Sequence, residues 1–378
     1  MKIVMAPDSF KESMTAKQAA EAIKLGFRSV FGESLDIDII PMADGGEGTI
    51  ESLMDALHGS LYEKVVTGPL GEKVRATYAL SGDQSLAVIE MAEASGLALV
   101  PAEKRNPLIT TTYGTGELIK DALDHGVKKI ILGIGGSATN DGGAGMIEAL
   151  GGEFIYRDSQ SSNRGGGTLV DLIDINLANF DSRIEQTEII VACDVDNPLL
   201  GKHGASAVYG PQKGATEEMV EQLDKGLANY HNVLARVTGR DVKDIPGAGA
   251  AGGLGAGLLH CFDALLEKGV EIVLKETDFY KRVTGADLVI TGEGKIDAQS
   301  IYGKTPVGVA QAAKSQGVKK VIAFCGTLGK DYELIYEAGI DAVFSITEGS
   351  CALDEALAKG PENLESTARN VARLLAWT

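Results

Sequence analysis

The chain begins with a short apolar run that leads directly into a polar loop. MKIVMA (1–6) has the length of a buried strand. Thr15 opens the sequence T-A-K-Q, in which Thr15 and Gln18 have the spacing of a capping box at the start of a helix. The pattern therefore predicts a strand, a loop and a helix that ends near Val30.

The same alternation of apolar and polar stretches follows. DIDII (36–40) predicts a second strand, the loop MADGGEG follows it, and a second helix is expected from about Thr49 to Leu57. Strands that alternate with helices are typical of a parallel sheet covered by helices. We therefore expect an α/β fold at this end of the chain.

The C-terminal end repeats this pattern. ADLVIT (286–291), KKVIAF (319–324) and DAVFSI (341–346) predict three further strands. Between the first two lies the polar loop GEGKIDAQSIYGKT, after which Pro306 fits the first turn of a helix that runs to Gln316. Both ends of the chain thus predict strands of the same kind of sheet.

The middle of the chain has a different pattern. TGPLGEKV, YALSG and SLAVIEMA have the character of short antiparallel strands, and glycine-rich loops and two longer helices follow them. We therefore predict a parallel, Rossmann-like sheet domain built from both chain ends, residues 1–64 and 283–378. Residues 65–282 are predicted to form an inserted α+β domain.

Composition and charge narrow the class of protein. The chain has 378 residues, 44% of them apolar, and a formal charge of −18, which suits a two-domain enzyme better than a disordered chain. The negative charge argues against nucleic acid and against anionic membranes as partners. No apolar run approaches the about 18 residues that span a bilayer. We expect a cytoplasmic protein, and the sequence leaves its oligomeric state open, a homo-oligomer included.

The most unusual stretch is GIGGSATNDGGAGM (133–146), which follows the apolar run VKKIIL and precedes an apolar helix. Glycine N–H groups at a helix N-terminus can bind phosphate oxygens. The alternative is a tight loop whose glycines serve packing and positive φ angles. The candidate phosphate- or ATP-binding residues are Gly135, Gly136, Ser137, Asn140, Gly142 and Gly143.

Other nucleotide-binding motifs are weak or missing. GIGGSA (133–138) and GAGAAG (247–252) match the dinucleotide fingerprint, but the first runs into a second polar stretch and the second follows no buried strand. No Walker A sequence and no protein-kinase motif set occurs. If the chain binds ATP, it therefore uses another kind of loop.

Carboxylates and lysines gather in the loops at predicted strand ends. Loop carboxylates suit Mg²⁺, which takes one or two of them and fills its remaining positions with phosphate oxygens and water. One carboxylate could instead accept a proton from an attacking hydroxyl, whereas an ordinary turn or capping role is the alternative for each of them. Lysines in the same loops could neutralise phosphate charge. The residues are Asp44, Asp194, Glu293 and Asp297, with Lys11, Lys213 and Lys304.

Taken together, APDSFKES, PMADGGEGT, TGPLG, GIGGSATNDGGAGM, ACDVDNPLLG, GPQKGA, GAAGGLGAGL and GEGKID resemble the bacterial glycerate kinase family, of the type I, two-domain group. The resemblance covers nearly the whole chain in the expected order. It implies ATP-dependent phosphorylation of D-glycerate with Mg²⁺. One position departs from the pattern, because Glu12 stands where many relatives carry glycine.

Roles for individual residues follow from their chemistry and placement. Ser9 and Lys11, together with Asp8, are assigned to D-glycerate. Asp194 is the first candidate for the base that takes the hydroxyl proton, and Asp44 is the second.

The remaining roles concern metal and phosphate. Glu293 and Asp297 are expected to hold Mg²⁺ directly or through water, and Lys304 to balance phosphate charge. The product expected from the resemblance is 2-phosphoglycerate, with 3-phosphoglycerate as the alternative. An NAD-dependent oxidoreductase of a small hydroxy acid and a non-catalytic phosphometabolite-binding protein are the other function classes that remain open.

Overall fold

The computed structural model describes residues 1–44, 48–157 and 164–377. Its contacts divide the chain into two compact units. Met1–Leu57 and Lys268–Thr378 form the first, which we call the terminal unit, and His58–Glu267 form the second, the inserted unit.

The bounds of these units differ from the predicted bounds at residues 64 and 283. Strand β3 (Ser60–Thr67) pairs along its whole length with β4 (Lys73–Leu80), so it belongs to the inserted unit. Helix α9 (Gly269–Glu276) packs against α11 (Thr305–Ser315) and so belongs to the terminal unit. The first difference arises from hairpin pairing with the next strand, and the second from packing against a helix further along the chain.

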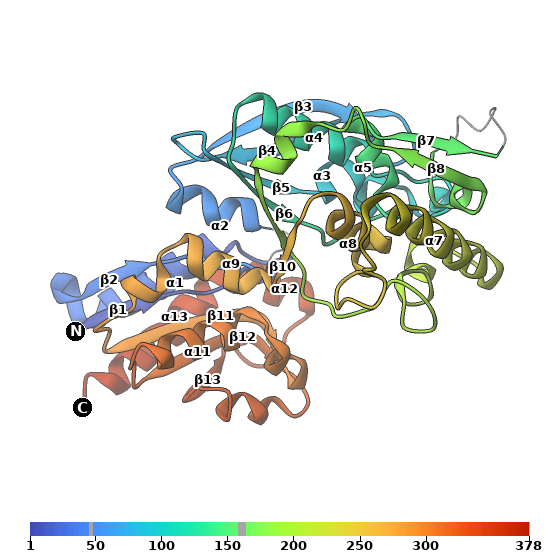
Figure 1. Ribbon diagram of the computed structural model, residues 1–378. Coiled ribbons are helices and arrows are strands. Elements are labelled where there is room, and N and C mark those ends of the chain that lie inside the picture. The colour runs from blue at the N-terminus through green and yellow to red at the C-terminus, as the bar shows by residue number, and fades with distance from the viewer. Residues whose placement is uncertain (45–47, 158–163, 378) are drawn as a thin grey trace. The chain divides into compact units, whose positions relative to one another are not determined.

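The terminal unit contains a parallel sheet with the strand order β13-β12-β11-β1-β2. The strands are β1 (Lys2–Met5), β2 (Asp36–Ile39), β11 (Leu288–Ile296), β12 (Val321–Leu328) and β13 (Ala342–Ser345). Strands β1 and β11, from opposite ends of the chain, run side by side (Figure 1). The predicted α/β class with a mostly parallel sheet is confirmed.

Strand β11 is longer than the sequence predicted. It continues through Gly292 and Glu293 to Ile296, because these residues pair with β12 in the register Glu293↔Cys325 and Ile296↔Leu328. The predicted loop therefore begins only after Ile296, and Glu293 lies on the strand itself.

Helices cover this sheet. Helix α1 (Ala16–Phe31) begins with the predicted capping box, in which the Thr15 side chain accepts from the Gln18 N–H. It packs against α13 (Gly360–Leu375) so closely that a Cβ at Gly26 would lie 2.6 Å from the Glu365 carbonyl. The other helices of the unit are α2 (Thr49–Ala56), α9, α10 (Phe279–Arg282), α11 and α12 (Leu353–Ala358).

The inserted unit contains a mixed sheet with the order β10-β9-β6-β5-β4-β3. Strands β5 (Leu86–Glu90), β6 (Lys129–Gly133), β9 (Glu188–Ala192) and β10 (Leu265–Glu267) are parallel, whereas β3 and β4 are antiparallel. The expected antiparallel strands thus make only part of the sheet. TGPLGEKV (67–74) contains the turn of the β3–β4 hairpin and is not a strand of its own. Strands β7 (Glu153–Tyr156) and β8 (Leu172–Asn176) form a separate pair.

The helices of the inserted unit are α3 (Ala92–Ser95), α4 (Tyr113–Asp124), α5 (Ala144–Ala149), α6 (Ala205–Tyr209), α7 (Glu217–Thr238) and α8 (Ala250–Cys261). Apolar residues of the parallel strands, such as Ile130 and Val191, pack in the core with Leu254 of α8 and Tyr230 of α7. Within the described ranges, no helix has the length and apolar character to cross a membrane.

Candidate active site

Asp8 lies just beyond the end of β1 and is almost fully buried. Its Oδ2 accepts a hydrogen bond from the Thr305 hydroxyl at 2.6 Å, and its Oδ1 accepts from the Ser9 N–H at 2.6 Å. Burial is the main reason that the pKa of Asp8 is raised to about 6, and the charge of Asp44 acts in the same direction. The hydrogen bonds from Thr305 and Ser9, and the charge of Lys11, lower it.

Glu293 lies on β11, the neighbour of β1 in the sheet. Its Oε1 accepts from the Ser300 hydroxyl at 2.9 Å and lies 4.0 Å from Lys304 Nζ. Burial raises the pKa of Glu293 to about 7, and the charges of Asp8 and Asp44 also raise it, against the effects of Lys304 and Ser300. Asp8, Asp44 and Glu293 therefore influence one another, and we call them the acidic cluster.

The two residues assigned to D-glycerate besides Asp8 lie on the turn that follows it. Ser9 is half-buried and Lys11 is exposed, and the turn is closed by the backbone pairing of Phe10 with Met14. Glu12 has a φ angle of 64° in this turn. Glycine is favoured in this conformation, which explains why glycine suits the position.

The two residues predicted to hold Mg²⁺ have different surroundings. Asp297 Oδ1 accepts from the Gln299 N–H at the start of a 3₁₀ turn, and its Oδ2 lies 2.9 Å from Lys295 Nζ. This pairing lowers the pKa of Asp297, whereas Glu293 belongs to the acidic cluster. Among residues 1–44, 48–157 and 164–377, no three Asp, Glu, His or Cys side chains converge to hold a metal by themselves.

In the inserted unit, the glycine-rich loop follows the end of β6, and its first part differs from its second. Gly135 and Gly136 are exposed, whereas Ser137 and the residues after it are buried. Gly136 has a φ angle of 71°. The surface of the loop is thus formed by its first glycine pair.

The second glycine pair packs inside the protein. A Cβ at Gly142 would lie 2.5 Å from Tyr230 Cε1, and a Cβ at Gly143 would lie 2.9 Å from Leu254 Cδ1. Both glycines have positive φ angles, 64° and 82°. These two positions therefore have the packing role that the sequence left open as the alternative.

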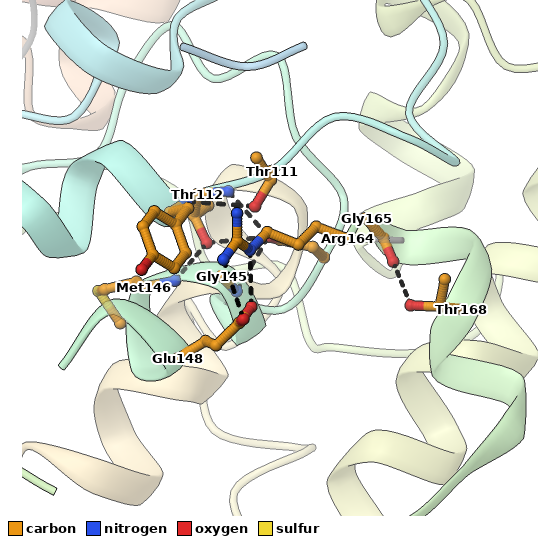
Figure 2. Close-up of polar contacts among 10 residues, drawn as sticks. Thr111, Thr112, Gly145, Met146, Glu148, Arg164, Gly165 and Thr168 are labelled. Atoms are coloured by element: carbon orange, nitrogen blue, oxygen red, sulfur yellow. Dashed lines mark hydrogen bonds and ion pairs between the residues drawn. The ribbon is translucent and has the colours of Figure 1, made fainter. Parts of the chain in front are cut away.

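Asp141 organises this second part of the loop. It is fully buried, its Oδ2 accepts from the Thr112 N–H and hydroxyl at 2.8 and 2.9 Å, and its Oδ1 accepts from the Gly143 N–H at 3.2 Å. The Thr112 hydroxyl oxygen also accepts from the Met146 N–H, and beside them Arg164 pairs with Glu148 (Figure 2). Burial raises the pKa of Asp141.

The middle of the loop contains two buried polar atoms without a hydrogen-bond partner among the described residues. They are Thr139 Oγ1 and Asn140 Oδ1. The Asn140 amide nitrogen donates to Ser206 Oγ at 3.0 Å. Lys213 Nζ lies beneath the loop, 2.7 Å from Ser137 Oγ and 2.6 Å from the Thr139 carbonyl. The loop thus combines glycine backbone, hydroxyls and one cation, which are groups that suit a phosphate.

Asp194 follows the end of β9, which is the neighbour of β6, and it is exposed. The carboxyl ends of β6 and β9 lie in register at Gly133↔Ala192. The fold therefore brings Asp194 and the glycine-rich loop to the same edge of one sheet, which is where parallel sheets bind ligands. Asp8, Asp44 and Glu293 are brought together at the corresponding edge of the other sheet.

Sequence reasoning missed several residues that shape these two sites. Thr305 and Ser300 are buried and bond directly to carboxylates of the acidic cluster. Thr112 likewise donates a hydrogen bond to the carboxylate of Asp141. The only signal in the sequence was that Ser300 and Thr305 lie in the polar loop GEGKIDAQSIYGKT, whose residues were singled out for their charges.

Comparison with known proteins decides the family. The sequence model of the glycerate kinase family matches residues 3–376. The chain belongs to the glycerate kinase family. It is similar to glycerate kinase from Halalkalibacterium halodurans, with 57% identity over 99% of this chain and 98% of the relative. It is also 50% identical to glycerate 2-kinase from Escherichia coli, over 100% of this chain and 98% of the relative.

A solved structure agrees with this family. The crystal structure of a protein from Salmonella typhimurium that is assigned as glycerate kinase 2 superposes with a TM-score of 0.90. The two sequences are 51% identical, and the match covers 100% of this chain and 98% of that one. The resemblance seen in the sequence motifs is confirmed, and the chain is a kinase of this family.

Proposed function

We propose that this glycerate kinase family member transfers the γ-phosphoryl group of ATP to D-glycerate, giving 2-phosphoglycerate and ADP. The observation that carries the proposal is the similarity over the full chain to relatives named glycerate kinase, among them the glycerate 2-kinase from Escherichia coli. The alternative product is 3-phosphoglycerate, which differs only in the hydroxyl that attacks.

The terminal unit is proposed to bind the acid substrate. Lys11 carries an exposed positive charge and Ser9 a hydroxyl, both on the turn after β1. They would pair with the carboxylate and a hydroxyl of D-glycerate, which Asp8 would also contact as an acceptor. Lys304, which precedes α11 and lies near Glu293, would balance charge on the transferred phosphoryl group.

The inserted unit is proposed to bind the phosphates of ATP. Gly135 and Gly136 are exposed at the end of β6, so their backbone is accessible to phosphate oxygens. Ser137 adds a hydroxyl, and the Asn140 amide nitrogen, which donates one of its two hydrogens to Ser206 Oγ, would donate the other to a phosphate oxygen. Gly142 and Gly143 would contribute indirectly, because their packing holds the second part of the loop in place.

The base and the metal ligands are proposed from carboxylate chemistry. Asp194 is the first candidate for the base because it is exposed at the same sheet edge as the loop, and Asp44 is the second. Glu293 fits a Mg²⁺ ligand because a cation would relieve the repulsion within the acidic cluster. Asp297, already paired with Lys295, would act at most through water. When bound, Mg²⁺ would supply charge neutralisation for the phosphates.

The test is ADP release from MgATP with D-glycerate, L-glycerate, glycolate and glycerol in parallel, followed by phosphorus NMR of the product. Release only with D-glycerate, and a 2-phosphoglycerate spectrum, is the expected result. A 3-phosphoglycerate spectrum would correct the product. Release with glycerol and not with glycerate would remove the substrate roles of Ser9 and Lys11, and no release with any acceptor would contradict the proposal.

The role of the base has its own test. Asp194→Asn keeps the shape of the side chain and removes its basicity, so kcat is expected to fall by about 10²-fold or more while the KM for ATP changes little. Asp196→Asn is the matched control, because Asp196 is an exposed carboxylate of the same loop. Activity of Asp194→Asn within a few-fold of the unchanged enzyme would move the role to Asp44.

A further inference from the structure

Lys213 is a lysine buried beneath the glycine-rich loop. It ends the short 3₁₀ turn Pro211–Lys213, and only 1% of its surface is exposed. Its Nζ lies 2.7 Å from Ser137 Oγ and 2.6 Å from the Thr139 carbonyl oxygen. The sequence placed this lysine among the cations that contact phosphate, but here its side chain contacts the loop from inside.

The two contacts of Nζ are compatible with both of its protonation states. The Thr139 carbonyl can only accept, so Nζ donates to it in either state. The Ser137 hydroxyl can donate or accept. Because an amine lone pair is a stronger acceptor than a hydroxyl oxygen, a neutral amine is expected to accept the Ser137 proton, whereas an ammonium has no lone pair and must donate to Ser137 Oγ.

This difference changes what Ser137 offers to a ligand. When Lys213 is a neutral amine, the Ser137 proton points toward Nζ and is not available. When Lys213 is an ammonium, Ser137 Oγ accepts from it, and the hydroxyl proton is free to donate to an anion. The protonation state of Lys213 and the ability of Ser137 to bind a phosphate oxygen are therefore linked through one hydrogen bond.

The charges around Lys213 leave its ammonium only partly compensated. Burial lowers the pKa of Lys213 to about 7, and the charge of Asp141 opposes this effect. Asp141 itself is held by the Thr112 and Gly143 N–H groups. Arg105 is a charged residue of the neighbouring segment, and it contacts Gly214, the residue after Lys213, through its backbone. An anion at the loop surface would add the negative charge that favours the ammonium.

We propose that Lys213 is a positioning residue of the glycine-rich loop, and that a phosphate group binds at Gly135–Ser137 together with one proton taken up by the Lys213 amine. The inference rests on the proposed binding of ATP phosphates by this loop. In the step, the amine lone pair of Nζ takes a proton from solvent, and Ser137 turns its own proton from Nζ to the phosphate oxygen. No covalent bond to the ligand forms.

The sign of the resulting pH dependence follows from linkage. Above the pKa of the free site, the amine is neutral before binding and must take up a proton to bind, so affinity falls as pH rises. The limiting slope is about tenfold in Kd per pH unit. Below that pKa the ammonium is already present, and the affinity becomes independent of this group.

The experiment is titration calorimetry of the full chain with MgADP at pH 8 in Tris and in HEPES, buffers with different ionisation enthalpies. The dependence of the measured heat on the buffer gives the number of protons taken up. MgADP is the probe because it cannot be turned over to product with D-glycerate. The unchanged protein is expected to take up between about half a proton and one proton, as binding linked to a group with a shifted pKa requires.

Three variants separate a proton-linked role from a structural one. Lys213→Met should lose the uptake and weaken MgADP binding by about tenfold or more, as loss of a buried charged partner does. Ser137→Ala keeps Lys213 but removes the linking hydroxyl, so its proton uptake should also fall. This variant tests the proposal even if Lys213→Met does not fold. Lys225→Met, an exposed lysine on α7, is the matched control and should behave like the unchanged protein.

The outcomes are distinguishable from failure of the proposed function. MgADP binding without proton uptake in the unchanged protein, or equal uptake in all three variants, would overturn the role of Lys213 and leave the kinase proposal intact. No MgADP binding together with no ADP release in the kinase assay would overturn both. Uptake that is present in the control and lost in both Lys213→Met and Ser137→Ala is the supporting result.

Discussion

Replacing Glu293 by glutamine is expected to stabilise the folded protein at alkaline pH, even though Glu293 belongs to the proposed active site. Glu293 is buried among Asp8 and Asp44, and these surroundings raise its pKa from 4.5 to about 7. Glutamine has nearly the same shape, its amide oxygen can still accept from the Ser300 hydroxyl, and it carries no charge. The substitution therefore removes the unfavourable charge and keeps the packing.

The magnitude follows from the shift in pKa. One pKa unit corresponds to about 1.4 kcal/mol, so the ionised carboxylate costs the folded state up to about 3 kcal/mol relative to the unfolded chain. At pH 8 the free energy of unfolding of the glutamine variant should exceed that of the unchanged protein by about 1–3 kcal/mol. The increase is smaller than the full cost of the charge because the attraction to Lys304 is lost as well.

The sign can be worked out from proton binding. Between the unfolded pKa of 4.5 and the folded value of about 7, the folded state holds a proton that the unfolded chain has released. The free energy of unfolding of the unchanged protein therefore falls as pH rises through this range, and it levels off above it. Glu293→Gln has no ionisable group at this position, so its free energy of unfolding lacks this dependence on pH. The difference in free energy of unfolding between the variant and the unchanged protein therefore grows from about zero at pH 4.5 as pH rises.

The assay is urea unfolding at pH 5, 6, 7 and 8, with kcat measured in parallel. Glu337→Gln is the matched control, because Glu337 is exposed and lies in the same unit. We expect Glu293→Gln to be more stable and less active at pH 8, and Glu337→Gln to be unchanged in both. Stability curves of Glu293→Gln and the unchanged protein that run parallel across pH would refute the reasoning.

Three further substitutions test packing and capping. Gly142→Ala should destabilise the protein by at least about 2 kcal/mol, since φ is 64° and the new Cβ would lie 2.5 Å from Tyr230 Cε1; an unchanged urea midpoint would show that the loop adapts. Tyr230→Phe should raise the melting temperature and increase the free energy of unfolding by about 1 kcal/mol, because the buried Tyr230 hydroxyl has no partner in the described part of the chain. A lower melting temperature would show that the hydroxyl has a partner. Thr15→Ala should cost about 1 kcal/mol in urea unfolding by removing the helix cap, and no loss would mean that the capping box is not stabilising.

Local patterns in the sequence predicted much of the fold. The terminal strands and the cap of α1 depend on short-range features, which are apolar run length and the spacing of Thr15 and Gln18. The extension of β11 to Ile296 depends instead on pairing with β12, whose paired residues lie 32 positions further along the chain, beyond any local window. The bound of the terminal unit at Lys268, where the sequence predicted residue 283, likewise depends on the packing of α9 against α11.

The candidate site was predictable at the level of loops and less so at the level of side chains. Parallel strands bring their following loops to one edge, so Asp8 and Glu293 could be expected to meet. Whether a lysine points outward or inward is decided by the chain packed around it, and the residue type of Lys213 gave no sign that it is buried. The different roles of Gly136 and Gly142 likewise depend on Tyr230, which is distant in the sequence.

The shifted pKa values in the two units point to ligands of opposite charge. Burial pushes Asp8 and Glu293 toward the neutral acid, and it pushes Lys213 toward the neutral amine. A cation near the acidic cluster and an anion near the glycine-rich loop would each restore the charged form, so each ligand would gain affinity from a charge that the free protein holds at a cost. Stability alone does not explain a carboxylate at Glu293 and an amine at Lys213, because neutral side chains of the same shape would give the folded protein a larger free energy of unfolding.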